Sequence, residues 1–415
     1  MKTVLRNDYL KKIRLFLDRP LVKVISGLRR TGKSVMLTTL AEILKKDGVP
    51  GSNIVYINKE SLEFDSIKTY SDLNLYVQKA IGQRREKKYI LIDEIQEIVG
   101  WEKAVASFLA QKAGDIVITG SNTRLLSAEL ATLITGRYVE IPVFPLSFRE
   151  FLDFRRLASK KVDLEKEFGL YLKYGGLPAV HHLPMNDDAI YPYLNSVLSA
   201  ILLRDVVRRH SIRDVTHLER IAAFVFDNCG SITTAKSIAD YFKSQRSSIT
   251  VDTVQSYLEF LTQAFLIRRI KRYDLKGKRH LEFFDKYYMG DIGLRHGLIG
   301  YRDADISGIL ENIVLLELLR RGYAVSVGSL NGAEVDFVAQ NQKGRMYVQV
   351  CYLLANNKTA EREFGNLEKI RDNYPKIVLS LDKHIPDNRN GIQHRNIIDF
   401  LLDGKYLPGL KQPVV

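Results

Sequence analysis

The sequence predicts an α/β protein in which a helix-wrapped parallel sheet precedes a helical stretch and a second, smaller α/β region. Three observations predict this order. Apolar strand-like runs alternate with helical runs between residues 21 and 143, which is the pattern of a parallel sheet. The strand signal then disappears between residues 146 and 212. It returns after residue 266, so the chain is expected to contain several domains.

The first region begins with a short amphipathic helix over residues 8–18, where apolar residues recur at helical spacing. Strands and helices then alternate, and the last strand ends before Pro145. The expected strands are 21–26, 53–57, 88–93, 115–119 and 137–143, and the expected helices between them are 35–44, 71–82 and 103–112. We assign residues 1–145 to this first domain.

Gly and Pro breaks separate the helices expected between residues 146 and 212, and we assign this stretch to a helical lid. Three further helices and two β-rich pieces, 266–274 and 279–288, describe a winged helix over residues 213–300. The remaining residues, 301–415, read as a small α/β domain. Its expected elements are a helix at 311–322, strands at 323–329, 334–340 and 346–353, a helix at 364–374 and a strand at 376–381.

The composition is that of a basic globular protein. The formal charge is +14, which favours polyanionic partners such as nucleic acid. Cys229 and Cys351 are the two cysteines, and so few thiols argue against a disulfide framework. The N-terminal residues do not have the pattern of a signal peptide and no window approaches 18 apolar residues, so we expect a soluble, cytoplasmic protein with no membrane partner.

A complete GxxxxGK[ST] motif follows the first strand and opens the first long helix. Its two glycines let the backbone wrap so that N–H groups and the helix N-terminus point at phosphate oxygens. Lys33 is expected to reach the β- and γ-phosphates, and the Ser34 hydroxyl to bind Mg²⁺. The sequence therefore predicts a P-loop NTPase that takes ATP and Mg²⁺. The expected nucleotide-binding residues are Gly27, Leu28, Arg29, Arg30, Thr31, Gly32, Lys33, Ser34 and Val35.

Two acidic residues, Asp93 and Glu94, end a buried apolar strand some way after this loop. Asp93 is expected to hold the magnesium shell, usually through water and Ser34. Glu94 can orient and polarise the water that attacks the γ-phosphorus, which predicts hydrolysis. The competing interpretation is a strand end with two solvated acids.

Further candidates follow the next strands. One apolar strand ends in small polar residues that could sense the γ-phosphate or the lytic water. The candidates are Ser121 and Asn122, with Thr119 a weaker one. A purely structural turn is the alternative for the same residues. Arg137 precedes the last strand, where a guanidinium could neutralise charge on the transferred phosphoryl group. Action across subunits would require a homo-oligomer, and a solvated surface arginine is the alternative.

With these motifs laid out, the chain resembles, nearly end to end, a prokaryotic AAA+-like ATPase family of the P-loop, ASCE type with a C-terminal region of unknown function. The resemblance rests on GLRRTGKS, LIDEIQ, ITGSN, LITGR, FPLSFREF, YGGLP, YYMGDIGL and GAEVDF. In related ATPases a Gly-Leu-Pro step in the lid lies against adenine, so the resemblance implies base contact by Leu177 and Pro178. A helix-breaking turn would have the same sequence.

The last domain resembles the restriction-endonuclease-like fold, whose metal site takes a helical Glu, a strand Asp and a Glu-x-Lys. Glu311 and Asp336 match the first two places. Glu334 lies on the same strand face as Asp336, which leaves residual metal binding as an alternative. Gln349 and Cys351 stand where the acid and the lysine belong. An amide is a poor magnesium ligand and a thiol cannot replace the lysine, so the resemblance implies a degenerate nuclease.

A dense run of Lys and Arg over residues 267–280 lies in the expected wing, where it could track nucleic-acid phosphates, DNA ahead of RNA. A winged helix that serves only as a packing module is the alternative. The leading hypothesis is a cytoplasmic ATPase that couples nucleotide state to a nucleic-acid or protein partner. The rivals are a DNA-binding regulator with ATP as a conformational ligand and, less favoured, an ATP-dependent nuclease.

Overall fold

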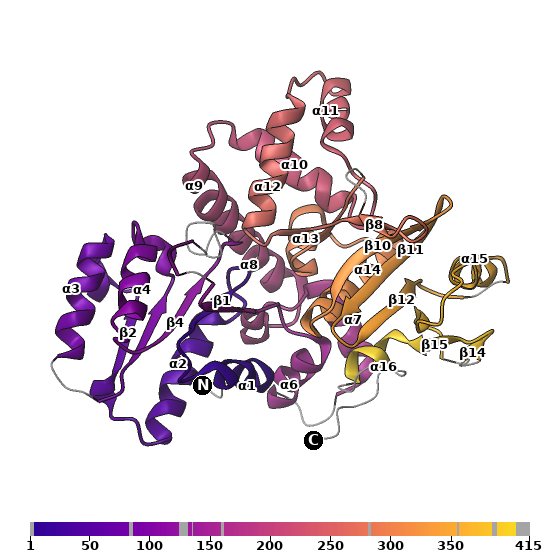
Figure 1. The fold of residues 1–415 in the computed structure, drawn as a ribbon. Coiled ribbons are helices and arrows are strands. Elements are labelled where there is room, and N and C mark those ends of the chain that lie inside the picture. Colours follow the sequence, from indigo (N-terminus) through magenta and orange to yellow (C-terminus); the bar gives the residue numbers. More distant parts are fainter. Residues whose placement is uncertain are drawn as a thin grey trace. The chain divides into compact units, whose positions relative to one another are not determined.

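Two compact units make up the chain, seen here in a computed structural model (Figure 1). The described residues are 4–82, 86–123, 132–134, 136–158, 162–280, 284–354, 357–383 and 388–403. Unit 1 contains Met1–Phe144 together with Gln263–Phe265, and unit 2 contains Pro145–Thr262 and Leu266–Val415. The finer division of unit 2 into lid, winged helix and α/β domain stays a prediction.

Unit 1 is built on a five-stranded parallel sheet, as the alternating pattern predicts. Its strand order is β2-β3-β4-β1-β5, so β4 lies between β1 and β3. Because all five strands run parallel, their carboxyl ends meet at one edge. The strands are β1 (Val22–Ser26), β2 (Ile54–Asn58), β3 (Tyr89–Asp93), β4 (Asp115–Gly120) and β5 (Tyr138–Pro142).

Helices cover both faces of this sheet, which explains why its strands are almost wholly apolar. In β3, Ile90 and Ile92 pack into the core that Phe108 shares, whereas Leu91 packs on the opposite face in the core that contains Leu37 and Leu40. Among the described residues of unit 1, the helices with defined bounds are α1 (Asn7–Phe16), α2 (Lys33–Lys46), α3 (Tyr70–Ile81) and α4 (Trp101–Ala110). The predicted α/β class is confirmed.

Unit 2 opens with a run of helices. A π-helical turn over Ile201–Val207 joins α8 to α9 without a break. The helices are α6 (Phe148–Ala158), α7 (Leu164–Tyr174), α8 (Asp187–Ala200), α9 (Arg208–His210), α10 (Val215–Asp227), α11 (Ala235–Ser244), α12 (Val251–Gln263) and α13 (Ile292–Ile299).

The basic β-rich stretch after α12 is divided between two sheets. β6 (Ile267–Ile270) pairs antiparallel with β9 (Lys286–Met289) as a separate two-stranded sheet. The hairpin of β7 (Arg272–Asp274) and β8 (Arg279–His280) instead joins the edge of a larger sheet through β10. The division falls at Lys271, whose carbonyl accepts from the Val327 N–H at 3.0 Å. Residues 281–283 of the second β-rich piece lie outside the described residues.

The larger sheet is mixed, with the order β14-β15-β13-β12-β11-β10-β7-β8. The predicted helix at 364–374 is misplaced: α15 ends at Glu368, and the chain then turns around Asp372, which accepts from the Tyr347 hydroxyl at 2.6 Å. The remaining elements are β10 (Ala324–Leu330), β11 (Ala333–Asn341), β12 (Gly344–Val350), β13 (Lys376–Ser380), β14 (Asn388–Arg389), β15 (Ile392–Asn396), α14 (Ile306–Arg320), α15 (Asn357–Glu368) and α16 (Ile397–Leu402).

Two of the motifs noted in the sequence, YGGLP and YYMGDIGL, interlock inside unit 2. Asp291 caps α13 through the Leu294 N–H at 3.2 Å and also accepts from the Gly176 N–H at 2.8 Å. A Cβ on Gly293 would stand 2.1 Å from the Tyr174 carbonyl oxygen, so only glycine fits there. Burial raises the pKa of Asp291 to about 6, although backbone N–H groups oppose the shift.

Replacing Asp291 by Asn should change how stability depends on pH. A carboxyl whose pKa is raised in the folded state stabilises it below the unfolded value near 3.8, and the contribution is lost as pH rises through about 6. The unfolding free energy of the wild type relative to Asp291→Asn should therefore rise by up to about 3 kcal/mol between pH 7 and pH 4. Urea unfolding of both proteins across this pH range measures the difference, and exposed Asp188→Asn serves as the control. A difference in unfolding free energy that does not change with pH would contradict the prediction.

Candidate functional site

The GxxxxGK[ST] loop follows β1 and opens α2, at the carboxyl edge of the unit 1 sheet. Gly27 has φ 147°, and a Cβ there would stand 2.2 Å from the Val143 carbonyl oxygen. Gly32 has φ 94° and precedes the first residue of α2. Both conformations favour glycine, so the backbone can wrap with its N–H groups turned toward a bound anion.

Lys33 crosses this loop from the start of α2. Its buried ammonium donates to the carbonyl oxygens of Gly27 at 2.9 Å and Leu28 at 3.0 Å. The Thr31 hydroxyl also donates to the Leu28 carbonyl, at 2.8 Å, which ties the turn together. Ser34 follows at the helix start, and Val35 is exposed beside it. The structure therefore brings the predicted loop residues into one cradle.

Two arginines position the loop. Arg6 is buried and donates to the carbonyls of Thr31 at 3.0 Å and Phe144 at 2.9 Å. Sequence reasoning missed it, because a lone Arg before a surface helix carries no distinguishing pattern. Arg29 is also buried and pairs with Glu60 at 3.2 Å, whereas Arg30 is exposed with φ 66°. The contacts of Arg6 and Arg29 therefore support a positioning role rather than a catalytic one.

The acidic pair lies at the same edge, linked by Thr119 at the end of β4. The Thr119 hydroxyl donates to Asp93 Oδ1 and accepts from the Glu94 N–H at 3.1 Å. Thr119 was the weakest candidate in its segment, yet it contacts both acids. The strand order explains this, since β4 separates β1 from β3 and places Thr119 between loop and acids.

Asp93 is buried, and the two oxygens of its carboxylate differ. Oδ1 is bound by Thr119, whereas Oδ2 has no hydrogen-bond partner among the described residues. Burial raises the pKa of Asp93, while the Thr119 and Ser34 hydroxyls and the Lys33 ammonium oppose the rise. A buried, unpaired anionic oxygen near a serine hydroxyl is what a hard cation such as Mg²⁺ needs.

Glu94 is held in an unusual backbone conformation, with φ 53°. Its Oε2 accepts from Gln96 Nε2 and from the Ser121 hydroxyl at 3.5 Å. Gln96 was not among the candidates, although it lies within the LIDEIQ motif. Asn122 is buried directly after Ser121. The structure therefore gathers Glu94, Ser121 and Asn122 around the end of β4.

Arg137 is not brought to this edge. It is exposed and precedes β5, and its carbonyl accepts from the Val22 N–H at the start of β1. The loop begins beyond the other end of β1, roughly 16 Å away for five strand residues. From this position Arg137 lies away from the nucleotide site of its own subunit, so the two remaining interpretations are action across subunits and a solvated surface arginine. Thr135 of the same motif lies outside the described residues.

The lid residues Leu177 and Pro178 belong to unit 2. Leu177 is buried, and Pro178 begins a 3₁₀ turn that ends at His182. The turn accounts for the helix break, and contact with adenine stays a prediction.

Two of the residues that the nuclease resemblance singles out in unit 2 meet a lysine that the sequence did not reveal. Lys286 on β9 pairs with Glu334 at 2.6 Å and Glu311 at 3.6 Å. Asp336 Oδ2 accepts from the Val350 N–H at 2.7 Å, and the Gln349 side-chain oxygen accepts from the Asp336 N–H at 3.4 Å. Cys351 is a buried free thiol, and burial raises its pKa. Within the described parts of the chain, no three His, Cys, Asp or Glu side chains form a metal-binding group.

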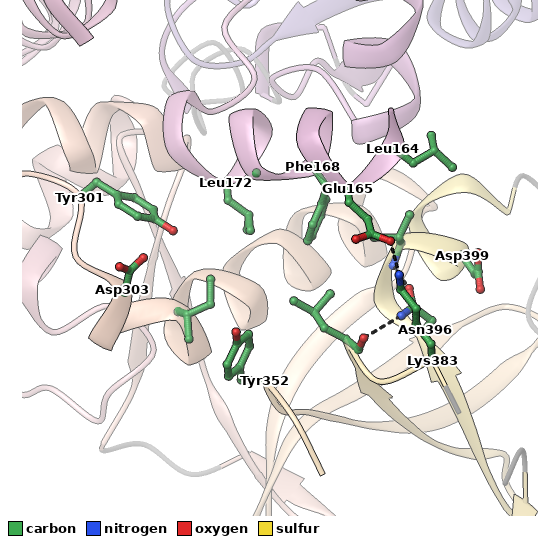
Figure 2. Close-up of a pocket in the computed structure, with 14 residues that line it drawn as sticks. Leu164, Glu165, Phe168, Leu172, Tyr301, Asp303, Tyr352, Lys383, Asn396 and Asp399 are labelled. Carbon is green, nitrogen blue, oxygen red and sulfur yellow. Dashed lines mark hydrogen bonds and ion pairs between the residues drawn. The ribbon is translucent and has the colours of Figure 1, made fainter. Parts of the chain in front are cut away.

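A separate cavity of about 610 Å³ lies elsewhere in unit 2 (Figure 2). Apolar side chains such as Phe168 and Leu172 line it, and Glu165 pairs with Lys383 beside it. Its described lining contains none of the residues that the sequence singles out. Across the described residues, no helix is both long and apolar enough to cross a membrane.

Fold and loop together define a P-loop NTPase, and the comparisons with known proteins agree. The model of an AAA domain matches residues 19–152, and that of a domain of unknown function (DUF8612) matches residues 165–305. An uncharacterized protein of Haemophilus influenzae is 39% identical over 96% of this chain and 98% of its own length. An uncharacterized protein of Methanocaldococcus jannaschii is 31% identical over 84% of this chain and 78% of its own length.

Among solved structures, the Walker-type ATPase PABY2304 of Pyrococcus abyssi matches with a TM-score of 0.51. The match covers 72% of this chain and 96% of that chain at 16% identity, so the likeness is one of fold. Given the Haemophilus influenzae relative, which matches nearly end to end, and the AAA domain, the chain belongs to the prokaryotic AAA+-like P-loop ATPase family.

Replacing Thr119 by Val should destabilise the protein by about 1–3 kcal/mol, because a buried Glu94 N–H loses its acceptor and Asp93 loses a donor. Thr119→Ser keeps the hydroxyl and should retain most of the stability. The free energy of unfolding in urea separates the two variants. A Thr119→Val protein no less stable than Thr119→Ser would contradict the role of the hydroxyl.

Proposed function

We propose that this chain binds ATP with Mg²⁺ and hydrolyses it. One observation carries the proposal: the loop from Gly27 to Ser34 follows β1 and the acids Asp93 and Glu94 end β3 at the same sheet edge, with Thr119 of the intervening strand β4 bound to both acids. A phosphate cradle that faces two buried carboxylates suits phosphoryl transfer to water.

Phosphate binding falls to the loop backbone, the N-terminus of α2 and Lys33. The Lys33 ammonium donates to two neutral loop carbonyls, and phosphate oxygens would make stronger, charge-assisted partners. The exchange needs little movement, because the ammonium is buried within the loop. Arg6 fixes the Thr31 carbonyl and so keeps the loop in shape.

The metal falls to Ser34 and the unpaired Oδ2 of Asp93, directly or through water. Mg²⁺ held by these residues would offset the negative charge of the phosphates. Glu94 is the general base, and its contacts with Gln96 and Ser121 fix one carboxylate oxygen while the other can accept a proton from water. Arg137 is assigned only to the nucleotide of a second subunit in a homo-oligomer.

Two substitutions separate binding from turnover. Lys33→Ala should weaken ATP binding by roughly 10- to 100-fold, because a charged hydrogen bond is worth about 1.5–3 kcal/mol. Glu94→Gln should keep binding and lower kcat by roughly 10²- to 10⁴-fold. Calorimetric titration with ATP and a phosphate-release assay measure the two effects.

Matched controls are Lys46→Ala at the far end of α2 and exposed Glu63→Gln, both of which should behave like the wild type. Unchanged hydrolysis in both Lys33→Ala and Glu94→Gln would refute the site. Binding without turnover in the wild type would instead favour the regulator, in which ATP is only a conformational ligand.

We also propose that the nucleotide state controls how unit 2 binds a nucleic-acid or protein partner. The β7–β8 hairpin supports nucleic acid, since Lys271, Lys276, Lys278 and Arg279 are exposed on or beside it. By contrast, Arg269 on β6 is paired with Asp285 at 2.5 Å. The free thiols of Cys229 and Cys351 fit a reducing cytoplasm.

Reversing two charges of the hairpin, with Lys276→Glu and Lys278→Glu, should weaken duplex DNA binding by roughly 10-fold or more. The slope of log affinity against log salt should fall by about 2, since each lost phosphate contact removes about 0.9. Fluorescence anisotropy at several salt concentrations tests this. Lys45→Glu with Lys46→Glu gives the same change in net charge; an equal loss in that control would reduce the effect to overall charge.

A further inference from the structure

A buried ammonium stands among the carboxylates of the nuclease-like region. Lys286 is the first residue of β9, Glu311 lies on α14, and Glu334 and Asp336 lie on β11. All four belong to unit 2. The ammonium pairs with Glu334 Oε1 at 2.6 Å and Glu311 Oε2 at 3.6 Å, so three elements distant in sequence meet at one positive charge.

Burial makes this charge dependent on its partners. Lys286 is only 4% exposed, and an isolated ammonium at that depth would be strongly disfavoured. Burial lowers the pKa of Lys286, but Glu311, Glu334 and Asp336 outweigh it and hold the pKa above its ordinary value. Burial in turn raises the pKa of Glu311 and Asp336, and the Lys286 charge opposes both shifts.

Other groups of the chain take up oxygens of the same carboxylates. Tyr288 donates its hydroxyl to Glu311 Oε2 at 3.0 Å, and the Val350 N–H donates to Asp336 Oδ2 at 2.7 Å. The Gln349 side chain faces the Asp336 backbone rather than a cation. Hydrogen bonds therefore already occupy carboxylate oxygens that a metal ion would need. Mg²⁺ requires several anionic or water oxygens in near-octahedral geometry, so this arrangement does not suit it.

The cluster also joins β9 to α14. Asn312, next to Glu311, accepts from the Met289 N–H at 2.6 Å and donates to the Met289 carbonyl at 3.0 Å. The first residue of β9 is therefore held by Glu311 and the last by Asn312. Removing Lys286 would leave Glu311 and Glu334 at one end of this attachment without their cation, and Asp336 without the positive charge that acts on it.

We propose that the Lys286 ammonium is the resident cation of this site, so that Glu311, Glu334 and Asp336 serve an internal ion-pair network instead of a divalent metal. The nuclease-like region is then a metal-independent module that fastens the β6–β9 sheet to α14 and β11. The lysine that the Cys351 position lacks is supplied from another strand, as a structural charge.

The test measures Mn²⁺ binding to the full, nucleotide-free chain after treatment with EDTA, by calorimetry and by electron paramagnetic resonance of free Mn²⁺. Wild type and Asp336→Asn should bind Mn²⁺ identically. Lys286→Met should lower the melting temperature by roughly 10 °C, whereas exposed Lys271→Met should not change it. Adding Asp336→Asn to Lys286→Met should recover part of the loss, since it removes one uncompensated charge.

Mn²⁺ binding by the wild type that Asp336→Asn abolishes would overturn the proposal, as would a Lys286→Met protein as stable as Lys271→Met. If Lys286→Met does not fold, Lys286→Arg gives the deciding result. It keeps the charge, so it should fold and bind Mn²⁺ no better than the wild type; an added site that depends on Asp336 would count against a resident lysine.

Discussion

The Thr119 hydroxyl is the contact on which the candidate nucleotide site depends, because it binds Asp93 and the Glu94 backbone at once. It occupies this place because β4 lies between the strand that carries the loop and the strand that carries the acids. With Oδ1 of Asp93 bound to Thr119, Oδ2 remains for a cation. Arg6 plays the matching part on the other side, where it fixes the Thr31 carbonyl of the loop. Neither residue needs to touch a nucleotide to decide whether one can bind.

Buried carboxylates are treated in opposite ways in the two units. In unit 1, Asp93 keeps an unpaired oxygen, which suits an exchangeable cation that arrives with a nucleotide. In unit 2, Glu311 and Glu334 face the fixed ammonium of Lys286, and a backbone N–H holds Asp336. A buried charge needs a partner, so the unpaired oxygen of Asp93 favours a cation, whereas the carboxylates of unit 2 already have one in Lys286. The arrangement in unit 1 suits a site that binds and releases a cation, and the arrangement in unit 2 suits a fixed structural ion pair.

The basic stretch after α12 shows how one local sequence can serve two structures. Arg269 on β6 is engaged with Asp285 inside the two-stranded sheet. Beyond Lys271 the chain passes to the edge of the eight-stranded sheet, where Lys276 and Lys278 are exposed in the β7–β8 turn. The number of Lys and Arg residues in this stretch therefore overstates how much positive charge is exposed to a polyanion. The exposed part belongs to the larger sheet and not to the ribbon that a winged helix would present.

The sequence by itself determined the α/β class, the loop from Gly27 to Ser34 and the acids Asp93 and Glu94. Each depends on a few consecutive residues, in which strand period, glycine conformation and side-chain chemistry are encoded locally. It placed α15 too late: the helix ends at Glu368, and Asp372 beyond it lies outside any helix and accepts from the Tyr347 hydroxyl of β12. Only the tertiary structure decided that β4 separates β1 from β3, that Arg6 supports the loop, that Arg137 lies at the opposite edge and that Lys286 meets Glu311 and Glu334. These relations join residues far apart in the chain, and burial and long-range pairing fix them where no local pattern can.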